Sequence, residues 1–201
     1  GKYQEAETLY GQAYEIYRRY ITGPDYHMAS LHNNLSLLYS ETGRLKEAKR
    51  ELERAMEIVR KLDDADVEVA ITHTNLGNLC FQMNETAEGK AHMEQAVRIF
   101  EKMPDGKDSH YASALSGLGE AYFHEGNLEA SQACYQKAMD EIFRFYGENE
   151  YYQVPKRNLE IVSDLLRRRQ AAEKSQMKGL ELAKAYYEEY GKTMIEEQFP
   201  E

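Results

Sequence analysis

Histidine and cysteine are the residue types in this chain that could bind a metal ion or act as nucleophiles. The six histidines are dispersed, and His32 and His73 are 41 residues apart. The two cysteines, Cys80 and Cys134, lack a Cys-x2-Cys partner. Because no cysteine or carboxylate completes a set of ligands around the two histidines, we predict no metal site. We expect both histidines to pack between helices, and both cysteines to be reduced and buried.

Motifs for catalysis are also missing from the sequence. It contains neither a glycine-rich nucleotide-binding motif nor a Gly-x-Ser-x-Gly nucleophile motif. Its carboxylates alternate with basic residues, as in Lys46-Glu47 and Glu51-x-Glu53-Arg54, a pattern typical of a solvated helix face. We therefore predict no catalytic residue and no cofactor, and we interpret the chain itself as non-enzymatic.

The elements that carry these side chains repeat along the sequence. The same pattern starts at Gly1, Gly43, Asn84 and Gly126, which are 42, 41 and 42 residues apart. A small residue stands five positions after each start, and an alanine stands twelve positions after it. A fixed period of this length is typical of a solenoid, in which each unit buries its apolar face against its neighbours.

Each unit is predicted to be a pair of helices, because apolar residues recur at helical spacing in two stretches per unit. In the second unit these stretches are Leu31 to Tyr39 and Ala48 to Val59. The residues that start the pattern fall in the turn between the two helices, where a left-handed backbone costs glycine least and asparagine next. In the third unit Gly89 replaces the usual alanine, at a cost of about 0.5–1 kcal/mol. We expect the second helix of that unit to be the least stable.

Composition limits the class of partner. The net charge of −10 argues against unselective binding to nucleic acid or to anionic membranes. The sequence contains no run of about 18 apolar residues and no signal-peptide pattern at its start, so we predict a cytoplasmic protein. We expect a single elongated unit rather than two globular domains.

The pattern Gly43-Arg44-Leu45-x2-Ala48-x3-Leu52-x2-Ala55 resembles the tetratricopeptide repeat, and the resemblance covers residues 1 to about 146. The units are longer than usual for that family. Such long units, preceded by the loops Gly23 to His27 and Gly106 to His110 and containing the segment His32 to Tyr39, are similar to kinesin light chain repeats. The resemblance implies an all-α, right-handed superhelical solenoid of antiparallel helix pairs with C-terminal capping helices. Residues 1–146 would hold the second half of one unit and three full units.

In this family the first helices line a concave groove that binds extended peptides or helices, so the resemblance implies a protein or peptide partner. The equivalent positions Asn34, Asn75, Gly117 and Asn158 form a column, and side-chain amides can pair with a peptide backbone of any sequence. The alternative is that these asparagines bond to neighbouring helices and bind no ligand. The peptide-binding residues that the resemblance implies are Asn33, Asn34, Leu37, Thr74, Asn75, Asn78, Phe81, Ser116, Glu120, Phe123 and Asn158.

One subtype of the family grips a C-terminal carboxylate, and we do not expect it here. A carboxylate clamp requires lysine or arginine at the inward positions of successive first helices. Those positions hold Asn33, Leu37, Ser113 and Gly117. Leu37, Phe81 and Phe123 instead predict a groove with an apolar stripe and polar flanks.

Beyond Gly147 the repeat pattern fades. We predict a capping helix or a degenerate fifth unit at 147–170, with its helix at Tyr151 to Arg169 and Pro155 in the first turn. A C-terminal extension at 171–201 is expected to hold a further helix from about Gln176 to Tyr190. The segments Gly179 to Gly191 and Met194 to Glu201 resemble the opening of an uncharacterised bacterial domain related to nucleotidyltransferases.

Three functions remain open from the sequence. The first is a protein-interaction scaffold that binds a peptide or helix in its groove. The second is a regulatory arm of a larger bacterial nucleotidyltransferase-like enzyme, since we expect the chain to be a fragment whose parent protein could be an enzyme. The third is a structural or self-associating spacer. The sequence does not predict an oligomeric state.

Overall fold

The structure is a computed structural model that describes residues 2–103 and 109–198; the side chains of residues 179, 180 and 182–198 are not described. The chain divides into two compact units, residues 1–159 and residues 160–201. Within the described residues all regular structure is helical, which confirms the expected all-α class. The helices are α1 (Lys2–Tyr20), α2 (Tyr26–Glu41), α3 (Leu45–Val59), α4 (Asp66–Gln82), α5 (Thr86–Lys102), α6 (Ser109–His124), α7 (Leu128–Tyr146) and α8 (Glu150–Gln198).

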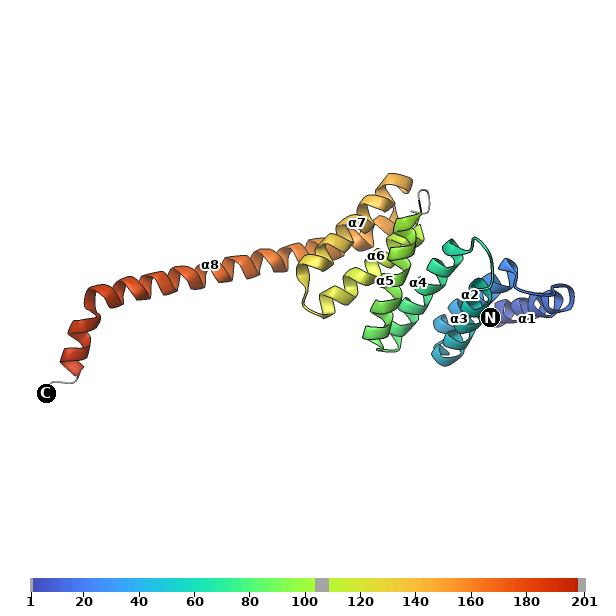
Figure 1. The fold of residues 1–201 in the computed structure, drawn as a ribbon, viewed down its shortest axis with the longest axis horizontal. Helices are drawn as coiled ribbons and strands as arrows, with labels where there is room; N and C mark the ends of the chain where they lie inside the picture. The colour runs from blue at the N-terminus through green and yellow to red at the C-terminus, as the bar shows by residue number, and fades with distance from the viewer. Residues whose placement is uncertain (1, 104–108, 199–201) are drawn as a thin grey trace. The chain divides into compact units, whose positions relative to one another are not determined.

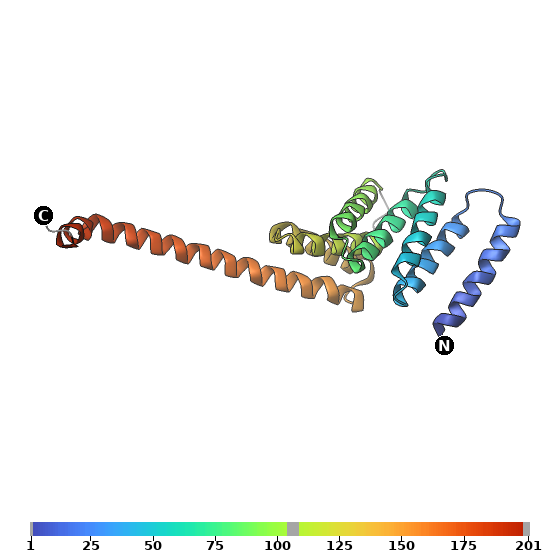
Figure 2. The same ribbon diagram turned by 90° about the horizontal axis from the view of Figure 1, so that it is seen from below.

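Helices α1 to α7 form a stack of antiparallel hairpins. The most extensive contacts join α2 to α3, α4 to α5, and α6 to α7, and each hairpin also contacts the next along the chain. Figures 1 and 2 show these helices side by side in chain order. The predicted solenoid of helix pairs is therefore confirmed, with α1 as the second helix of an incomplete first unit.

The turns inside the hairpins have one shared backbone geometry. Gly43, Asn84 and Gly126 have φ values of 75°, 61° and 76°, so each occupies the left-handed region that the sequence predicted. The next residue closes the helix end: Arg44 N–H donates to the Tyr39 carbonyl at 2.8 Å, and the other two turns repeat this bond. This pattern is a Schellman motif, which satisfies carbonyl groups that a helix end would leave unpaired.

Helix α2 begins at a side-chain cap. The carboxylate of Asp25 accepts hydrogen bonds from the backbone N–H groups of His27 at 2.8 Å and Met28 at 3.3 Å. These hydrogen bonds lower the pKa of Asp25 although burial acts in the opposite direction. Asp25 thus explains why the Gly-x-Asp-x-His loop precedes a helix. In the second such loop, residues 106–108 lie outside the described residues.

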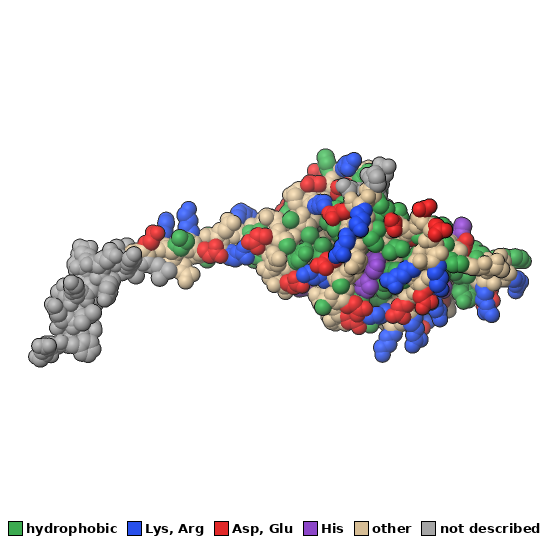
Figure 3. Space-filling view, in the orientation of Figure 1, with side chains coloured by type: hydrophobic (Ala, Val, Ile, Leu, Met, Phe, Trp, Pro, Cys, Tyr) green, Lys and Arg blue, Asp and Glu red, His purple; other side chains and the backbone are tan. Residues whose placement is uncertain are grey.

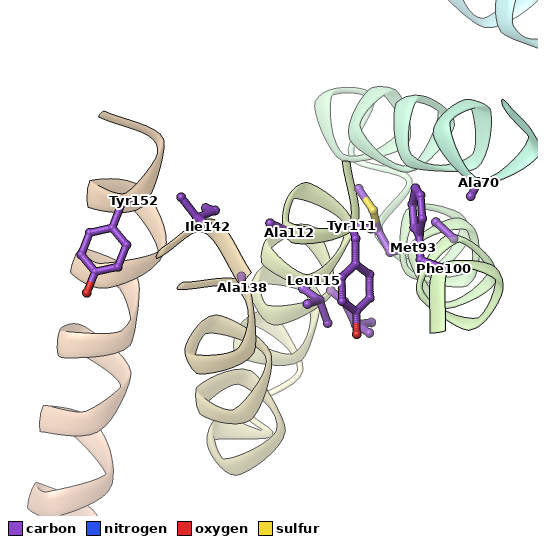
Figure 4. Packing of buried hydrophobic residues seen from close by; sticks show 12 residues of the cluster. Ala70, Met93, Phe100, Tyr111, Ala112, Leu115, Ala138, Ile142 and Tyr152 are labelled. Atoms are coloured by element: carbon purple, nitrogen blue, oxygen red, sulfur yellow. The ribbon is translucent and has the colours of Figure 1, made fainter. Parts of the chain in front are cut away.

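The apolar stripes of neighbouring hairpins meet in two buried clusters. The first lies mainly among α2, α3 and α4 and includes Leu52 and Val59; the second extends from α4 to the start of α8. Figure 4 shows side chains of the second cluster, in which the rings of Phe100 and Tyr111 pack with centroids 5.8 Å apart. Each cluster joins successive units, so a single hairpin does not bury its own apolar face.

Three glycines permit close approaches in this stack. A Cβ added at Gly77 or Gly117 would lie 2.8 Å or 2.5 Å from Cε of Met93, so this methionine fills the space that both glycines leave. A Cβ added at Gly89 would lie 2.6 Å from Cε1 of Phe81 and 3.0 Å from the Gly77 carbonyl oxygen. Gly89, interpreted from the sequence as a weak point, therefore makes room for an aromatic ring.

Ion pairs connect each second helix to the turn of the following unit. The polarity of the first pair is the reverse of that of the other two. The pairs are Glu7 with Arg44 at 2.8 Å, Lys49 with Glu85 at 2.7 Å, and Lys90 with Glu125 at 2.7 Å.

Helix α8 corrects the expected structure of the C-terminal region. A helix over Tyr151 to Arg169 followed by a separate one over Gln176 to Tyr190 is wrong, because Glu150–Gln198 is one continuous helix. The linking residues 170–175 contain no glycine or proline, so nothing in them ends the helix. Pro155 lies in the second turn rather than the first, since α8 begins after Asn149, whose side chain accepts a hydrogen bond from Tyr152 N–H at 3.0 Å. The division at residues 146 and 170 stays a prediction.

Candidate functional site

The first helices of the second and third units line a cavity of about 410 Å³. Most of its lining comes from α2 and α4, with His110 from α6. The lining residues are Tyr26, His27, Ala29, Ser30, Asn33, Asn34, Leu37, Glu68, Ile71, Asn75 and His110. Four of the residues predicted to bind a peptide are therefore brought together here: Asn33, Asn34, Leu37 and Asn75.

Two of these asparagines bond to each other across the unit boundary. Asn75 Nδ2 donates to Asn33 Oδ1 at 3.0 Å, and Asn33 Nδ2 donates to Thr72 Oγ1 at 3.2 Å. Part of the hydrogen-bonding capacity of these two amides therefore joins α2 to α4. This agrees with the alternative interpretation, in which the asparagines bond to neighbouring helices. These bonds fix the orientation of the two amides in the cavity wall.

Asn34 and Leu37 are available to a ligand. The Asn34 side chain is exposed, and the described residues offer its amide no hydrogen-bond partner. Leu37 is 51% exposed although it lies in the middle of a helix whose neighbouring residues are buried. One free amide beside one exposed leucine gives the cavity both a backbone-pairing group and an apolar contact.

Three expected groove positions lie elsewhere. Thr74 was expected to face the groove, and this is wrong: it is 2% exposed and its hydroxyl donates to the Ala70 carbonyl at 2.9 Å. The half-buried ring of Phe81 packs toward Gly89, between the helices of its own unit. Gly117, the gap in the asparagine column, is buried beneath Met93. Close packing between helices determines where these three residues lie, and a repeat pattern in the sequence does not reveal such packing.

The remaining predicted residues are spread over the third and fourth units and the start of α8. Ser116 lines a separate cavity of about 750 Å³ between α6, α7 and the start of α8. Asn78 and Glu120 are exposed, and Phe123 is half-buried with its ring 5.8 Å from that of His124. Asn158 is half-buried and hydrogen-bonds to Tyr135, whose pKa burial raises to about 12. None of these residues lines the cavity over α2 and α4.

The periodic histidines lie between helices, as predicted. Buried His32 hydrogen-bonds through Nδ1 to Glu51 Oε2 at 2.6 Å. Glu51, expected on a solvated face, is instead only 8% exposed, because it is the partner of this histidine. His73 takes the equivalent place in the third unit, where its Nδ1 lies 2.8 Å from Nδ1 of His92. Burial, and then the neighbouring His92, lower the pKa of His73 to about 4.

A cluster that the sequence analysis missed lies beside this histidine pair. The ligand atoms of Cys80, Glu88 and His92 all lie within 4.8 Å of one another. Cys80 is free and buried, and burial raises its pKa to about 11. Glu88 and His92 are one helical turn apart on α5, and this spacing is the part of the cluster that is visible in the sequence. The proximity of Cys80 on α4 becomes visible only once the two helices are packed. Cys134, expected to be buried, is only half-buried.

Charged side chains of both signs lie on the surface of the repeats (Figure 3). Figure 3 shows acidic and basic side chains interspersed on one face, with hydrophobic side chains between them. The lining of the cavity over α2 and α4 includes Glu68 but no lysine or arginine. This cavity therefore lacks the cations that a carboxylate clamp needs. Among the described residues, no helix combines the length and hydropathy needed to span a membrane.

Comparison with known proteins identifies the repeat. A family model described as tetratricopeptide repeat matches residues 1–61, 27–102 and 68–140. No curated protein is similar enough to the chain to be matched.

Solved structures with the same fold share little sequence with the chain. BtubC (BKLC) from P. vanneervenii is 22% identical, with a TM-score of 0.71 over 93% of this chain and 76% of that one. A putative kinesin light chain with nearly identical repeats from Podosopora anserina is 18% identical, with a TM-score of 0.66 over 96% and 90% of the two chains. The first tetratricopeptide repeat domain of Spaghetti (RPAP3), bound to the HSP90 peptide SRMEEVD, is 20% identical, with a TM-score of 0.55 over 71% and 95%.

Proposed function

The chain belongs to the tetratricopeptide repeat family, and we propose that this protein-interaction scaffold holds an extended peptide in the cavity over α2 and α4. One observation carries the proposal: Asn34 and Leu37 present an unpaired amide and an exposed apolar side chain in the same cavity wall. The amide can pair with the backbone of a peptide, while the leucine contacts one of its apolar side chains.

Charge defines the class of peptide. The cavity lining holds one carboxylate, Glu68, and no lysine or arginine, and the chain carries a net charge of −10. An acidic peptide such as SRMEEVD, which the Spaghetti (RPAP3) domain binds, would enter this cavity without a cation to pair with it. We therefore propose a neutral or basic segment with an apolar side chain, and we expect SRMEEVD not to bind.

Peptide display tests the proposal. Extended peptides selected on the wild-type chain would be measured by fluorescence anisotropy against Asn34→Ala and Leu37→Ser, with Gln136→Ala on α7 as the control. Loss of one hydrogen bond of about 1 kcal/mol weakens binding about fivefold in Asn34→Ala. Both residues are exposed, so the melting temperature should stay within about a degree of wild type. Unchanged affinity in both variants, or selection of acidic peptides only, would refute the proposal.

A further inference from the structure

We propose that Cys80, Glu88 and His92 form a binding site for a divalent cation of the zinc class in the third unit. Their three ligand atoms lie within 4.8 Å of one another. A tetrahedral zinc ion bound to sulfur, nitrogen and oxygen holds such atoms about 3.5 Å apart. Rotation of the three side chains closes this difference, because Cys80 is in the last turn of α4 and the other two residues are on the adjoining face of α5.

His73 orients His92 for this role. Nδ1 of His92 lies 2.8 Å from Nδ1 of His73, whereas Nε2 of His92 lies toward Glu88, 3.9 Å from Oε1. With its proton on Nδ1, neutral His92 donates to His73 and keeps the Nε2 lone pair for the metal. Histidine ligands usually have their second nitrogen held by an acceptor in this way. His73, 8% exposed, is thus a positioning residue rather than a ligand.

The charges of the site balance a divalent cation. Binding of the cation displaces the Cys80 thiol proton to solvent; the resulting thiolate and the Glu88 carboxylate supply two negative charges, and His92 is a neutral donor. Lys49 is the cation that contacts Glu88, with Nζ 2.7 Å from Glu85 and 3.2 Å from Glu88. Glu85 can keep the lysine when Glu88 turns to the metal, so no charge is left unpaired. The Glu88 side chain is 49% exposed, which leaves the fourth position open to water.

The other units show that this combination is not a general property of the repeat. The second unit has Tyr39, Glu47 and Glu51 at the three positions, and the fourth has Tyr122, Ala130 and Cys134. Neither set joins a thiolate to an imidazole, the donors that zinc prefers. The turns of the three hairpins share one backbone geometry, so the third unit differs from the others at these positions in its side chains.

Titration with Co²⁺ tests the site through its absorption spectrum. We expect the wild-type chain to bind one Co²⁺ with visible d–d bands of tetrahedral geometry and a thiolate-to-cobalt charge-transfer band, both removed by Zn²⁺. Cys80→Ser should lose the charge-transfer band, while Cys134→Ser, the control at the other cysteine, should keep it. Absence of the band from the wild type, or its survival in Cys80→Ser, would overturn the assignment. Helix content without metal, measured by circular dichroism, confirms that each variant is folded.

Two further variants separate a metal site from a chance cluster. Lys49→Met removes a competing positive charge and should tighten Co²⁺ binding roughly tenfold. His73→Leu should weaken it roughly tenfold while the charge-transfer band remains, because the ligands are unchanged. Unchanged Co²⁺ affinity in Lys49→Met would place the bound metal away from Lys49, and either this result or weaker binding would overturn the proposal. Unaltered affinity in His73→Leu would remove His73 from its positioning role.

Discussion

Replacing Gly89 by alanine in α5 tests whether an aromatic ring fills the space that this glycine leaves. Alanine is favoured over glycine inside a helix by about 1 kcal/mol, so propensity alone predicts a more stable protein. The structure predicts the reverse. The added Cβ would lie 2.6 Å from Cε1 and 2.7 Å from Cδ1 of Phe81, and 3.0 Å from the carbonyl oxygen of Gly77.

The size of the effect follows from these distances. Two of the three close atoms belong to the Phe81 ring, which must move and lose contact with its surroundings; overpacking of this kind costs about 1–3 kcal/mol. Subtracting the gain in propensity leaves a net destabilisation of about 1 kcal/mol. In a Phe81→Ala background the ring is gone, and Gly89→Ala should be neutral or stabilising. The coupling between the two changes is then about 1–2 kcal/mol.

Urea unfolding followed by circular dichroism measures all four proteins of this cycle. Gly11→Ala in α1 is a matched control, because nothing lies within 4 Å of a Cβ added there. It should stabilise the chain by up to about 1 kcal/mol. If Gly89→Ala stabilises the wild-type background as Gly11→Ala does, the ring does not occupy this space and the reasoning fails.

Substitutions at two sites and one labelling experiment have defined outcomes. Asp25→Ala removes the cap of α2 and should lower the free energy of unfolding by about 1 kcal/mol in urea titration, whereas Asp25→Asn should lose less. Met93→Ala empties the space between Gly77 and Gly117 and should cost about 2–5 kcal/mol in the same assay; a loss below about 1 kcal/mol would contradict the packing. Burial raises the pKa of Cys134 from 9.0 to about 11. The folded state therefore favours the neutral thiol, and this contribution to stability is complete below pH 9 and lost as the pH rises toward 11. At pH 8 the native chain should contain about a hundredfold less Cys134 thiolate than the unfolded chain. Iodoacetamide labelling followed by mass spectrometry measures the difference, and equal labelling in urea and buffer would refute it.

The fold could be predicted from the sequence because the residue patterns that specify it are short and recur in every unit. Gly43, Asn84 and Gly126 mark turns whose left-handed backbone restricts the residue type, and the apolar stripes between them have helical spacing. The same logic failed at α8, where the absence of a repeat pattern was interpreted as a break although residues 170–175 favour a helix.

The candidate site was less predictable because it depends on contacts between helices. Asn34 and Leu37 were identified by register, but register could not show that Thr74 is buried or that Asn33 and Asn75 bond to each other. The cluster at Cys80 joins residues from two helices, and only one of its spacings, from Glu88 to His92, is visible along the chain. The tail that resembles a nucleotidyltransferase-like domain lies largely outside the described residues. Residues 199–201 are not described, nor are the side chains of residues 179, 180 and 182–198.

The reversed first ion pair distinguishes the unit of α2 and α3 from the units that follow it. Glu7 meets Arg44, whereas at the next junction Lys49 meets Glu85. Deleting the intervening unit would set Glu7 against Glu85, and duplicating it would set Lys49 against a second copy of Arg44. Like charges would then oppose each other at the new junction. Loss or duplication of this unit is thereby penalised, whereas the junctions at Lys49 and Lys90 have the same polarity and do not distinguish the later units from each other.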